Sequence, residues 1–132
     1  MKLTGLTPNL FTNHLDRSVA FYRDVLGFSV VTTVPDVPPF IFVWLKRDEV
    51  SVFVNDAAAA ALDLTKMPSV EVGRSGVTIF VHVEGIAELW ETVTNQAHVV
   101  QPLKEQWYGM TEFSLADPDG YIVTFAERTA AS

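Results

Sequence analysis

The chain contains no cysteine among its 132 residues. This absence excludes disulfide bonds, thiolate zinc sites and cysteine nucleophiles. Basic residues are also few: 9 Lys and Arg stand against 16 Asp and Glu, which gives a formal net charge of −7. Nucleic-acid binding requires clustered positive charge, so we expect no nucleic-acid partner. Acidity could attract a cationic ligand, but many soluble cytosolic domains are equally acidic, and we favour that simpler explanation.

Long apolar runs are missing as well. Residues 1–11 lack the apolar core of a signal peptide. No stretch approaches the roughly 20 apolar residues of a membrane span. We therefore expect a cytoplasmic protein without a membrane partner. Hydrophobic residues make up 48% of the chain, which is ample for a packed core, and the length suits one domain over residues 1–132.

The residue pattern predicts the order strand, helix and three strands twice. In the first copy the helix begins at Asn13 as its N-cap and ends at Gly27. Its strands are expected at 6–13, 28–34, 40–45 and 50–55, with a charged turn at 46–49. The second copy is expected to contain strands at 77–83, 98–100, 111–116 and 121–127, a helix at 85–97 and a hairpin turn at 117–120.

The two copies define modules of approximately residues 6–55 and 77–127. The connection, 56–76, is weakly helical over 56–67 and irregular over 68–75. Phe21 and Trp90 occupy matching helix positions, and Val30-Val31 matches Val99-Val100 at an offset of 69 residues. Such units would bury their helices against curved sheets and leave the opposite sheet faces around one cavity.

Three motifs occur in an order that is typical of one family. The first is Ser18-Val19-Ala20-Phe21-Tyr22-Arg23-Asp24-Val25-Leu26-Gly27-Phe28, the second is Trp107-Tyr108-Gly109-Met110-Thr111-Glu112-Phe113, and the third is Asp117-Pro118-Asp119-Gly120-Tyr121. Together they resemble the glyoxalase, bleomycin-resistance and extradiol-dioxygenase (vicinal oxygen chelate) superfamily, and most of all its bleomycin-resistance branch. The resemblance covers residues 6–127. It implies an α+β fold in which two βαβββ modules form an open, curved mixed sheet, a half-barrel around a cavity.

The same resemblance bears on metal binding, because enzymes of this superfamily hold one divalent ion with His, Glu or Gln. The equivalent positions here are Thr7, Thr78 and Thr124, with Ser51 or Phe53 nearest to the fourth. Alcohols bind divalent ions poorly, so we expect no metal and no other cofactor. A shifted site that uses His82, Glu112 or Glu127 is the alternative, although strand parity turns Glu127 away from Thr124.

Strand alternation and the aromatic residues predict the cavity lining. The candidate ligand-binding residues are Thr7, Asn9, Phe11, Trp44, Phe53, Thr78, Phe80, His82, Trp107, Tyr108 and Thr124, with Ile122 beside them. For Trp44, a place in the core or a dimer interface is an equal alternative. Aromatic faces with a few hydroxyls suit a planar or amphipathic molecule, and a cationic one would add cation–π attraction.

The chain has no serine–histidine–acid order, phosphate loop or paired carboxylates, so we assign no catalytic residue. The hypothesis is a metal-independent small-molecule-binding protein that sequesters an aromatic or cationic compound, as in antibiotic resistance. The alternative is a metal-dependent, glyoxalase-like lyase or a dioxygenase with shifted ligands. Open sheet edges predict a homodimer.

Overall fold

The computed structural model describes residues 1–62, 72–73 and 76–129. The chain forms two compact units, unit 1 (Met1–Gly73) and unit 2 (Arg74–Ser132), each with its own four-stranded mixed sheet. The predicted modules fall one in each unit, whereas the organisation as a single domain stays a prediction. Within the described residues, no helix is both long enough and apolar enough to span a membrane.

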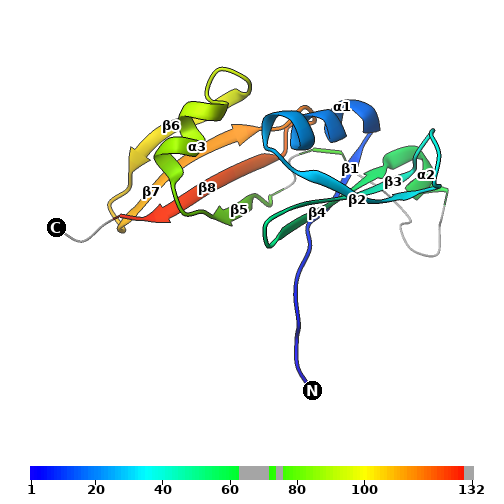
Figure 1. Cartoon of the computed structure of the whole chain (residues 1–132), viewed down its shortest axis with the longest axis horizontal. Coiled ribbons are helices and arrows are strands. Elements are labelled where there is room, and N and C mark those ends of the chain that lie inside the picture. The colour runs from blue at the N-terminus through cyan, green and yellow to red at the C-terminus, as the bar shows by residue number, and fades with distance from the viewer. Residues whose placement is uncertain (63–71, 74–75, 130–132) are drawn as a thin grey trace. The chain divides into compact units, whose positions relative to one another are not determined.

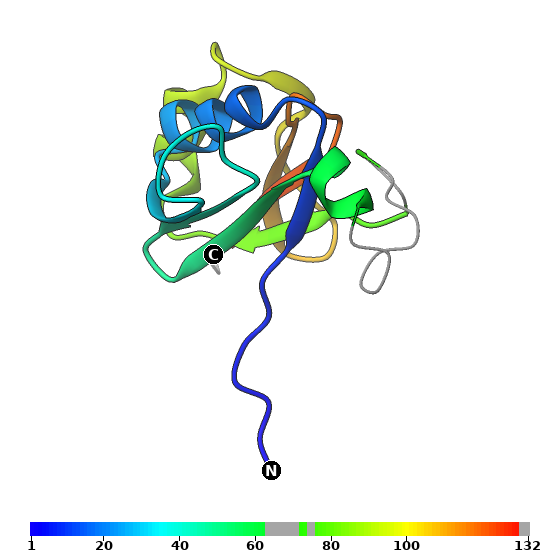
Figure 2. The same cartoon turned by 90° about the vertical axis from the view of Figure 1, so that its right-hand side faces the viewer.

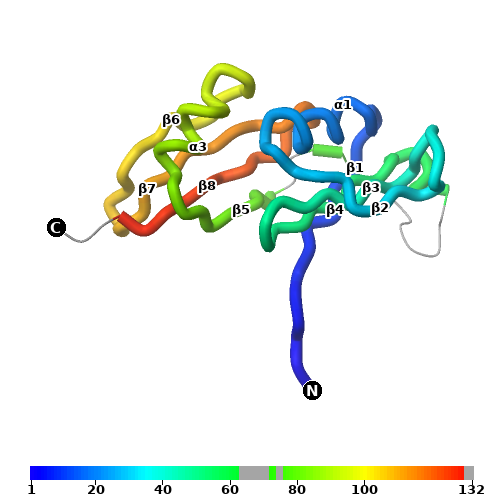
Figure 3. Tube along the Cα trace, in the orientation of Figure 1, coloured from blue at the N-terminus to red at the C-terminus, as the bar shows by residue number. Residues whose placement is uncertain are grey.

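The order of elements is the same in both units (Figures 1 and 3). Unit 1 contains β1 (Asn9–Thr12), α1 (Leu15–Ala20), the π-helix η1 (Phe21–Val25), β2 (Ser29–Val34), β3 (Phe42–Arg47), β4 (Val50–Asp56) and α2 (Ala57–Ala61). Unit 2 contains β5 (Ile79–His82), α3 (Ile86–Val93), β6 (His98–Glu105), β7 (Met110–Ala116) and β8 (Ile122–Arg128). The predicted α+β fold of two βαβββ modules is confirmed, and each sheet is open rather than closed into a barrel.

The sheets also share their topology. The strand orders are β1-β4-β3-β2 and β5-β8-β7-β6, with the first pair parallel and the other two antiparallel in each. Each sheet has a register shift at the matching place, between Val30 and Thr32 in β2 and between Val99 and Gln101 in β6. The two β-bulges are therefore also 69 residues apart, the offset that the sequence predicted. Each bulge reverses which residues of its strand point to each face of the sheet.

The core of unit 1 lies between α1, η1 and one face of its sheet (Figure 1). The apolar side chains buried there are Leu10, Leu15, Val19, Phe21, Tyr22, Leu26, Phe28, Val43, Leu45, Val52 and Val54. The helix N-cap is His14 rather than the predicted Asn13. The reason is that Thr12, fully buried at the end of β1, accepts a hydrogen bond from the His14 backbone N–H at 3.0 Å.

The exit from this helix follows the prediction. Gly27 has φ of +74°, which an L side chain rarely adopts. The backbone N–H of Phe28 then donates to the Tyr22 carbonyl at 2.8 Å. Arg47 lies over Gly27 and donates to the Leu26 carbonyl at 2.8 Å, so the strand β3 closes the helix end. In Figures 1 and 2 the residues that precede β1 extend away from the sheet.

In unit 2, α3 packs on one face of the sheet through Trp90. The Trp90 ring lies 5.1 Å from the ring of Phe113, which stacks in turn on Phe125 at 5.1 Å. Ile86 and Val93 of α3 are buried, so the expected packing of this helix against the sheet is confirmed. The helix ends at Val93, earlier than predicted.

Other boundaries differ from the prediction as well: the strands expected at 6–13 and 77–83 are shorter, β1 at Asn9–Thr12 and β5 at Ile79–His82. Lys46 and Arg47 belong to β3, so the turn before β4 contains only Asp48 and Glu49. The strand that starts at His98 continues past its bulge to Glu105. Of the helix predicted at 56–67, the structure shows α2 (Ala57–Ala61), and residues 63–67 lie outside the described residues. The Asp56 carboxylate caps α2 by accepting from the Ala59 backbone N–H at 2.9 Å. The irregular connection predicted at 68–75 is described only at residues 72–73.

The hairpin before β8 is confirmed. The Gly120 N–H donates to the Asp117 carbonyl at 3.0 Å, and Gly120 has φ of +91°. The Asp117 carboxylate accepts from the backbone N–H groups of Asp119 at 2.9 Å and Tyr121 at 3.0 Å. This side chain therefore holds the turn closed in the manner typical of an Asx turn.

Candidate ligand-binding site

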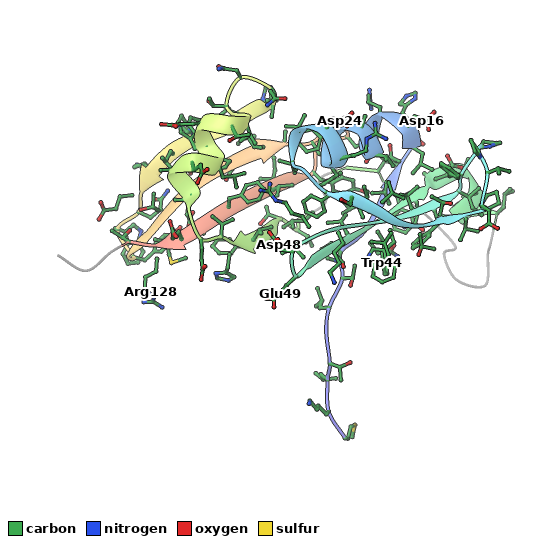
Figure 4. All side chains as sticks on the ribbon, viewed as in Figure 1. Asp16, Asp24, Trp44, Asp48, Glu49 and Arg128 are labelled. Carbon is green, nitrogen blue, oxygen red and sulfur yellow. The ribbon has the colours of Figure 1, made fainter. Side chains whose placement is uncertain are left out.

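The face of the unit 1 sheet opposite α1 is rich in aromatic side chains. Strand register puts Asn9 beside Phe53 and Phe53 beside Trp44. A second row across the same face contains Phe11, Asn55 and Phe42. We call these six residues the aromatic face. Figure 4 shows Trp44 projecting from β3 on the side away from α1.

The aromatic rings of this face contact one another edge to face. The Phe53 ring lies 5.1 Å from that of Phe42 and 5.9 Å from that of Trp44. Trp44 also donates its indole N–H to the Ser51 hydroxyl at 3.0 Å, which orients the ring. All three rings are only half-buried, unlike the apolar residues on the helix side of the same strands. A platform of this kind offers ring faces and edges to a planar molecule.

Two amides complete the aromatic face. Asn55 donates through Nδ2 to the Asn9 side-chain oxygen at 2.5 Å and to the Leu10 carbonyl at 3.1 Å. Asn9 is exposed, and its Nδ2 makes no hydrogen bond to any described residue. The face thus combines four partly accessible rings, an available amide donor and no ionisable group.

The equivalent face of unit 2 is polar. Its first row across the sheet is Gln101, Ser114, Thr124 and Phe80. Its second row is Glu112, Ala126 and His82. We call these seven residues, together with Tyr108, the polar face. Phe80 and His82 form its rim, exposed and with ring centroids 5.2 Å apart.

Two hydrogen bonds organise the polar face. The hydroxyls of Ser114 and Thr124, both buried, share a hydrogen bond of 2.7 Å. Tyr108 donates its hydroxyl to the buried carboxylate of Glu112 at 2.5 Å. This bond raises the pKa of Tyr108, because a proton held by a carboxylate is harder to remove. Tyr108 is therefore a hydrogen-bond donor at neutral pH.

The predicted site residues divide between these faces. Asn9, Phe11, Trp44 and Phe53 belong to the aromatic face, and Phe80, His82, Tyr108 and Thr124 to the polar face. Thr7 and Thr78 precede β1 and β5, and Ile122 begins β8. Trp107 is 93% exposed in the turn between β6 and β7, with its ring 5.4 Å from that of Tyr108. Ligand contact by these residues stays a prediction.

Six residues of the two faces were not predicted as ligand-binding: Phe42, Asn55, Gln101, Glu112, Ser114 and Ala126. Alternation along β3, β4, β7 and β8 was a sufficient signal for five of them. Alternation along β6 could not assign Gln101 to this face. The bulge at Val100 puts Val99 and Gln101 on opposite faces of the sheet, although they are only two residues apart.

The donors on these faces do not fit a divalent metal. Thr124, at a position that the family gives to a ligand, is an alcohol already hydrogen-bonded to Ser114. Over residues 1–62, 72–73 and 76–129, no three His, Asp or Glu side chains gather closely enough to hold an ion. Glu127 accepts from the backbone N–H groups of Gly85 at 2.9 Å and Ile86 at 3.2 Å. Its predicted orientation away from Thr124 is confirmed.

Comparison with known proteins gives consistent matches. The model of the Glyoxalase/Bleomycin resistance protein/Dioxygenase superfamily matches residues 6–125. Bleomycin resistance proteins of Geobacillus stearothermophilus and Staphylococcus aureus are each 26% identical over 129 residues, which cover 92% of this chain and 94% of theirs.

Solved structures agree at the level of the fold. TioX from Micromonospora sp. ML1 has a TM-score of 0.75 at 20% identity, and the match covers 95% of this chain and 98% of TioX. A glyoxalase/bleomycin resistance protein/dioxygenase from Nocardioides has a TM-score of 0.78 at 19% identity, covering 100% of this chain and 87% of that one.

Proposed function

The chain belongs to the glyoxalase/bleomycin resistance protein/dioxygenase superfamily, and on that premise we propose that it binds and sequesters an aromatic small molecule on its aromatic face. Binding does not depend on a metal. The observation that carries this function is the cluster of Phe42, Trp44 and Phe53, three half-buried rings on the side of the sheet opposite α1.

Physical chemistry supports binding rather than catalysis at this face. Its side chains are rings and amides, which bind by stacking and hydrogen bonding but cannot transfer protons at neutral pH. The matched bleomycin resistance proteins support the same class of function, so bleomycin is the first compound to test. The acidic composition of this chain does not by itself favour that ligand.

The test is a calorimetric titration with bleomycin, then with single-ring and fused-ring aromatic compounds, with and without EDTA. We expect Phe53→Ala to weaken binding of the best compound at least about tenfold, because it removes the ring that contacts both neighbours. EDTA should leave the affinity unchanged.

The matched control is Val37→Ala, which shortens an exposed apolar side chain outside the face. It should bind as the unaltered protein does. The proposed function is wrong if Phe53→Ala retains full affinity for every compound bound. It is also wrong if EDTA abolishes binding while stoichiometric zinc, nickel, iron or manganese is found in the purified protein.

A further inference from the structure

The polar face contains a buried acid without a cationic partner. Glu112 is 5% exposed, and one of its oxygens accepts from Tyr108. Lys104 is its neighbour across the strand pair, but it is exposed. Among the described residues, no Lys, Arg or His forms an ion pair with Glu112. Burying an ionised carboxylate without a cation is costly, and one hydroxyl donor offsets only part of that cost.

A second group on this face lacks a partner as well. The Gln101 Nε2 atom is buried and makes no hydrogen bond to any residue that the structure describes. The Ser114 and Thr124 hydroxyls beside it in the same row are bonded to each other. A buried amide donor without an acceptor is destabilising, so its retention here calls for an acceptor from outside the sheet.

The spacing of the Glu112 carboxylate and the Gln101 amide defines the kind of ligand that could pair with both. Glu112 and Ser114 are two residues apart on β7, which corresponds to roughly 7 Å along a strand. Gln101 lies beside Ser114 on β6. Tyr108 lies beside Glu112, to which it is hydrogen-bonded, and Phe80 lies at the far end of the row that begins with Gln101. A compact molecule that carries a cation and an acceptor a few bonds apart would reach both.

We propose that the polar face is itself a ligand-binding site, and that it takes a protonated amine at Glu112 and a carbonyl oxygen at Gln101. The ligand class is therefore an aromatic amine that bears an amide or a similar carbonyl group. This inference goes beyond binding at the aromatic face. Tyr108 acts as a positioning residue, because its hydroxyl holds the Glu112 carboxylate in place.

Three small probes separate these contributions. Phenylalaninamide carries the ring, the ammonium and the carboxamide, 3-phenylpropanamide lacks the ammonium, and phenethylamine lacks the carboxamide. Calorimetric titration of the unaltered protein should show phenylalaninamide binding at least about tenfold more tightly than either of the others, since each of them leaves one buried group unpaired.

Two nearly isosteric variants assign each preference to its residue. Glu112→Gln should abolish the preference for phenylalaninamide over 3-phenylpropanamide and keep its preference over phenethylamine. Gln101→Leu should keep the preference over 3-phenylpropanamide and abolish the preference over phenethylamine. It should not lower the unfolding temperature, because the amide nitrogen that it removes has no hydrogen-bond partner among the described residues. Glu91→Gln and Gln96→Leu, both exposed and on or next to α3, are the matched controls and should keep both preferences.

The outcomes distinguish the two proposals. If the protein binds the three probes with equal affinity, or if Glu112→Gln keeps the preference for the ammonium, this inference is overturned while small-molecule binding stands. If neither the probes nor any compound of the aromatic panel binds, both proposals fall. The affinity ratios are measured within one variant at a time, so a moderate loss of stability does not affect them.

Discussion

Residues at equivalent positions of the two units have different chemical roles. Trp44 and Phe53 occupy the row that Ser114 and Thr124 occupy in unit 2, each pair side by side on the third and fourth strands. The rings leave an accessible apolar surface, whereas the hydroxyls bond to each other. One backbone pattern therefore presents an aromatic face in the first unit and a polar one in the second.

Trp107 gives the sharpest prediction at the residue scale. It is 93% exposed, so Trp107→Ala should change the free energy of unfolding by less than about 0.5 kcal/mol. If the ring contacts ligand, as its place next to Tyr108 suggests, affinity should fall about tenfold or more. Thermal unfolding and calorimetric titration with phenylalaninamide measure the two effects separately.

Trp90→Ala is the control for Trp107, because Trp90 packs on Phe113 beneath α3. It should cost several kcal/mol of stability, approaching the roughly 3–5 kcal/mol of a core Trp. A large loss of stability in Trp107→Ala, with unchanged affinity, would show that Trp107 is a packing residue.

At the scale of elements, α3 depends on a residue from the last strand. Its N-cap is Gly85, with φ of +86°, which supplies no side-chain acceptor for the first backbone N–H groups. The Glu127 carboxylate at the end of β8 accepts from the N–H groups of Gly85 and Ile86 instead. The helix is thereby joined to the sheet by hydrogen bonds as well as by Trp90 packing.

We predict that Glu127→Ala lowers the free energy of unfolding by about 1 kcal/mol, the typical effect of losing a helix cap. Glu127→Gln should lose less, because its amide oxygen still accepts one hydrogen bond. Glu91→Ala, on the exposed side of α3, is the control and should have little effect. Urea unfolding followed by circular dichroism measures all three, and equal stability of Glu127→Ala and the unaltered protein would contradict this role.

At the scale of the whole molecule, the edge strands of the two sheets differ. β2 is an edge strand with the residues Ser29–Val34, none of them charged, and it exposes Val30, Val31 and Val34. The equivalent edge strand β6 carries Pro102, Lys104 and Glu105, residues that protect an edge from pairing. An unprotected edge favours association with a second copy of the chain.

We therefore expect a homodimer, with a mass twice the 14.6 kDa of the chain in sedimentation equilibrium. A lysine at the bulge of β2, Val31→Lys, should shift the equilibrium towards monomer. Val100→Lys, at the equivalent bulge of β6, is the matched control and should leave the dimer intact. A monomer mass for the unaltered protein at micromolar concentration would contradict the prediction.

Much of the fold was predictable because its signals are local in the sequence. The motif that ends in Leu26-Gly27-Phe28 specifies a helix end, since only glycine adopts φ of +74° readily. The hairpin at Asp117 is equally local, because one carboxylate closes it. Repetition of the same order of elements then predicts two modules of one topology, and both sheets have it.

The sequence by itself determined these elements, their order and the parity of most strand residues, because backbone preferences and alternation act between near neighbours. Only the tertiary structure decided which polar groups pair. Thr12 pairs with the His14 backbone N–H ahead of α1, and Glu127 pairs with the first backbone N–H groups of α3 from 41 residues or more away in the chain. Gln101 joins the polar face because a bulge reverses its parity, and Glu112 is seen to lack a cation only once its neighbours across the sheet are known. Such partners meet through packing over long stretches of chain, which no local pattern records.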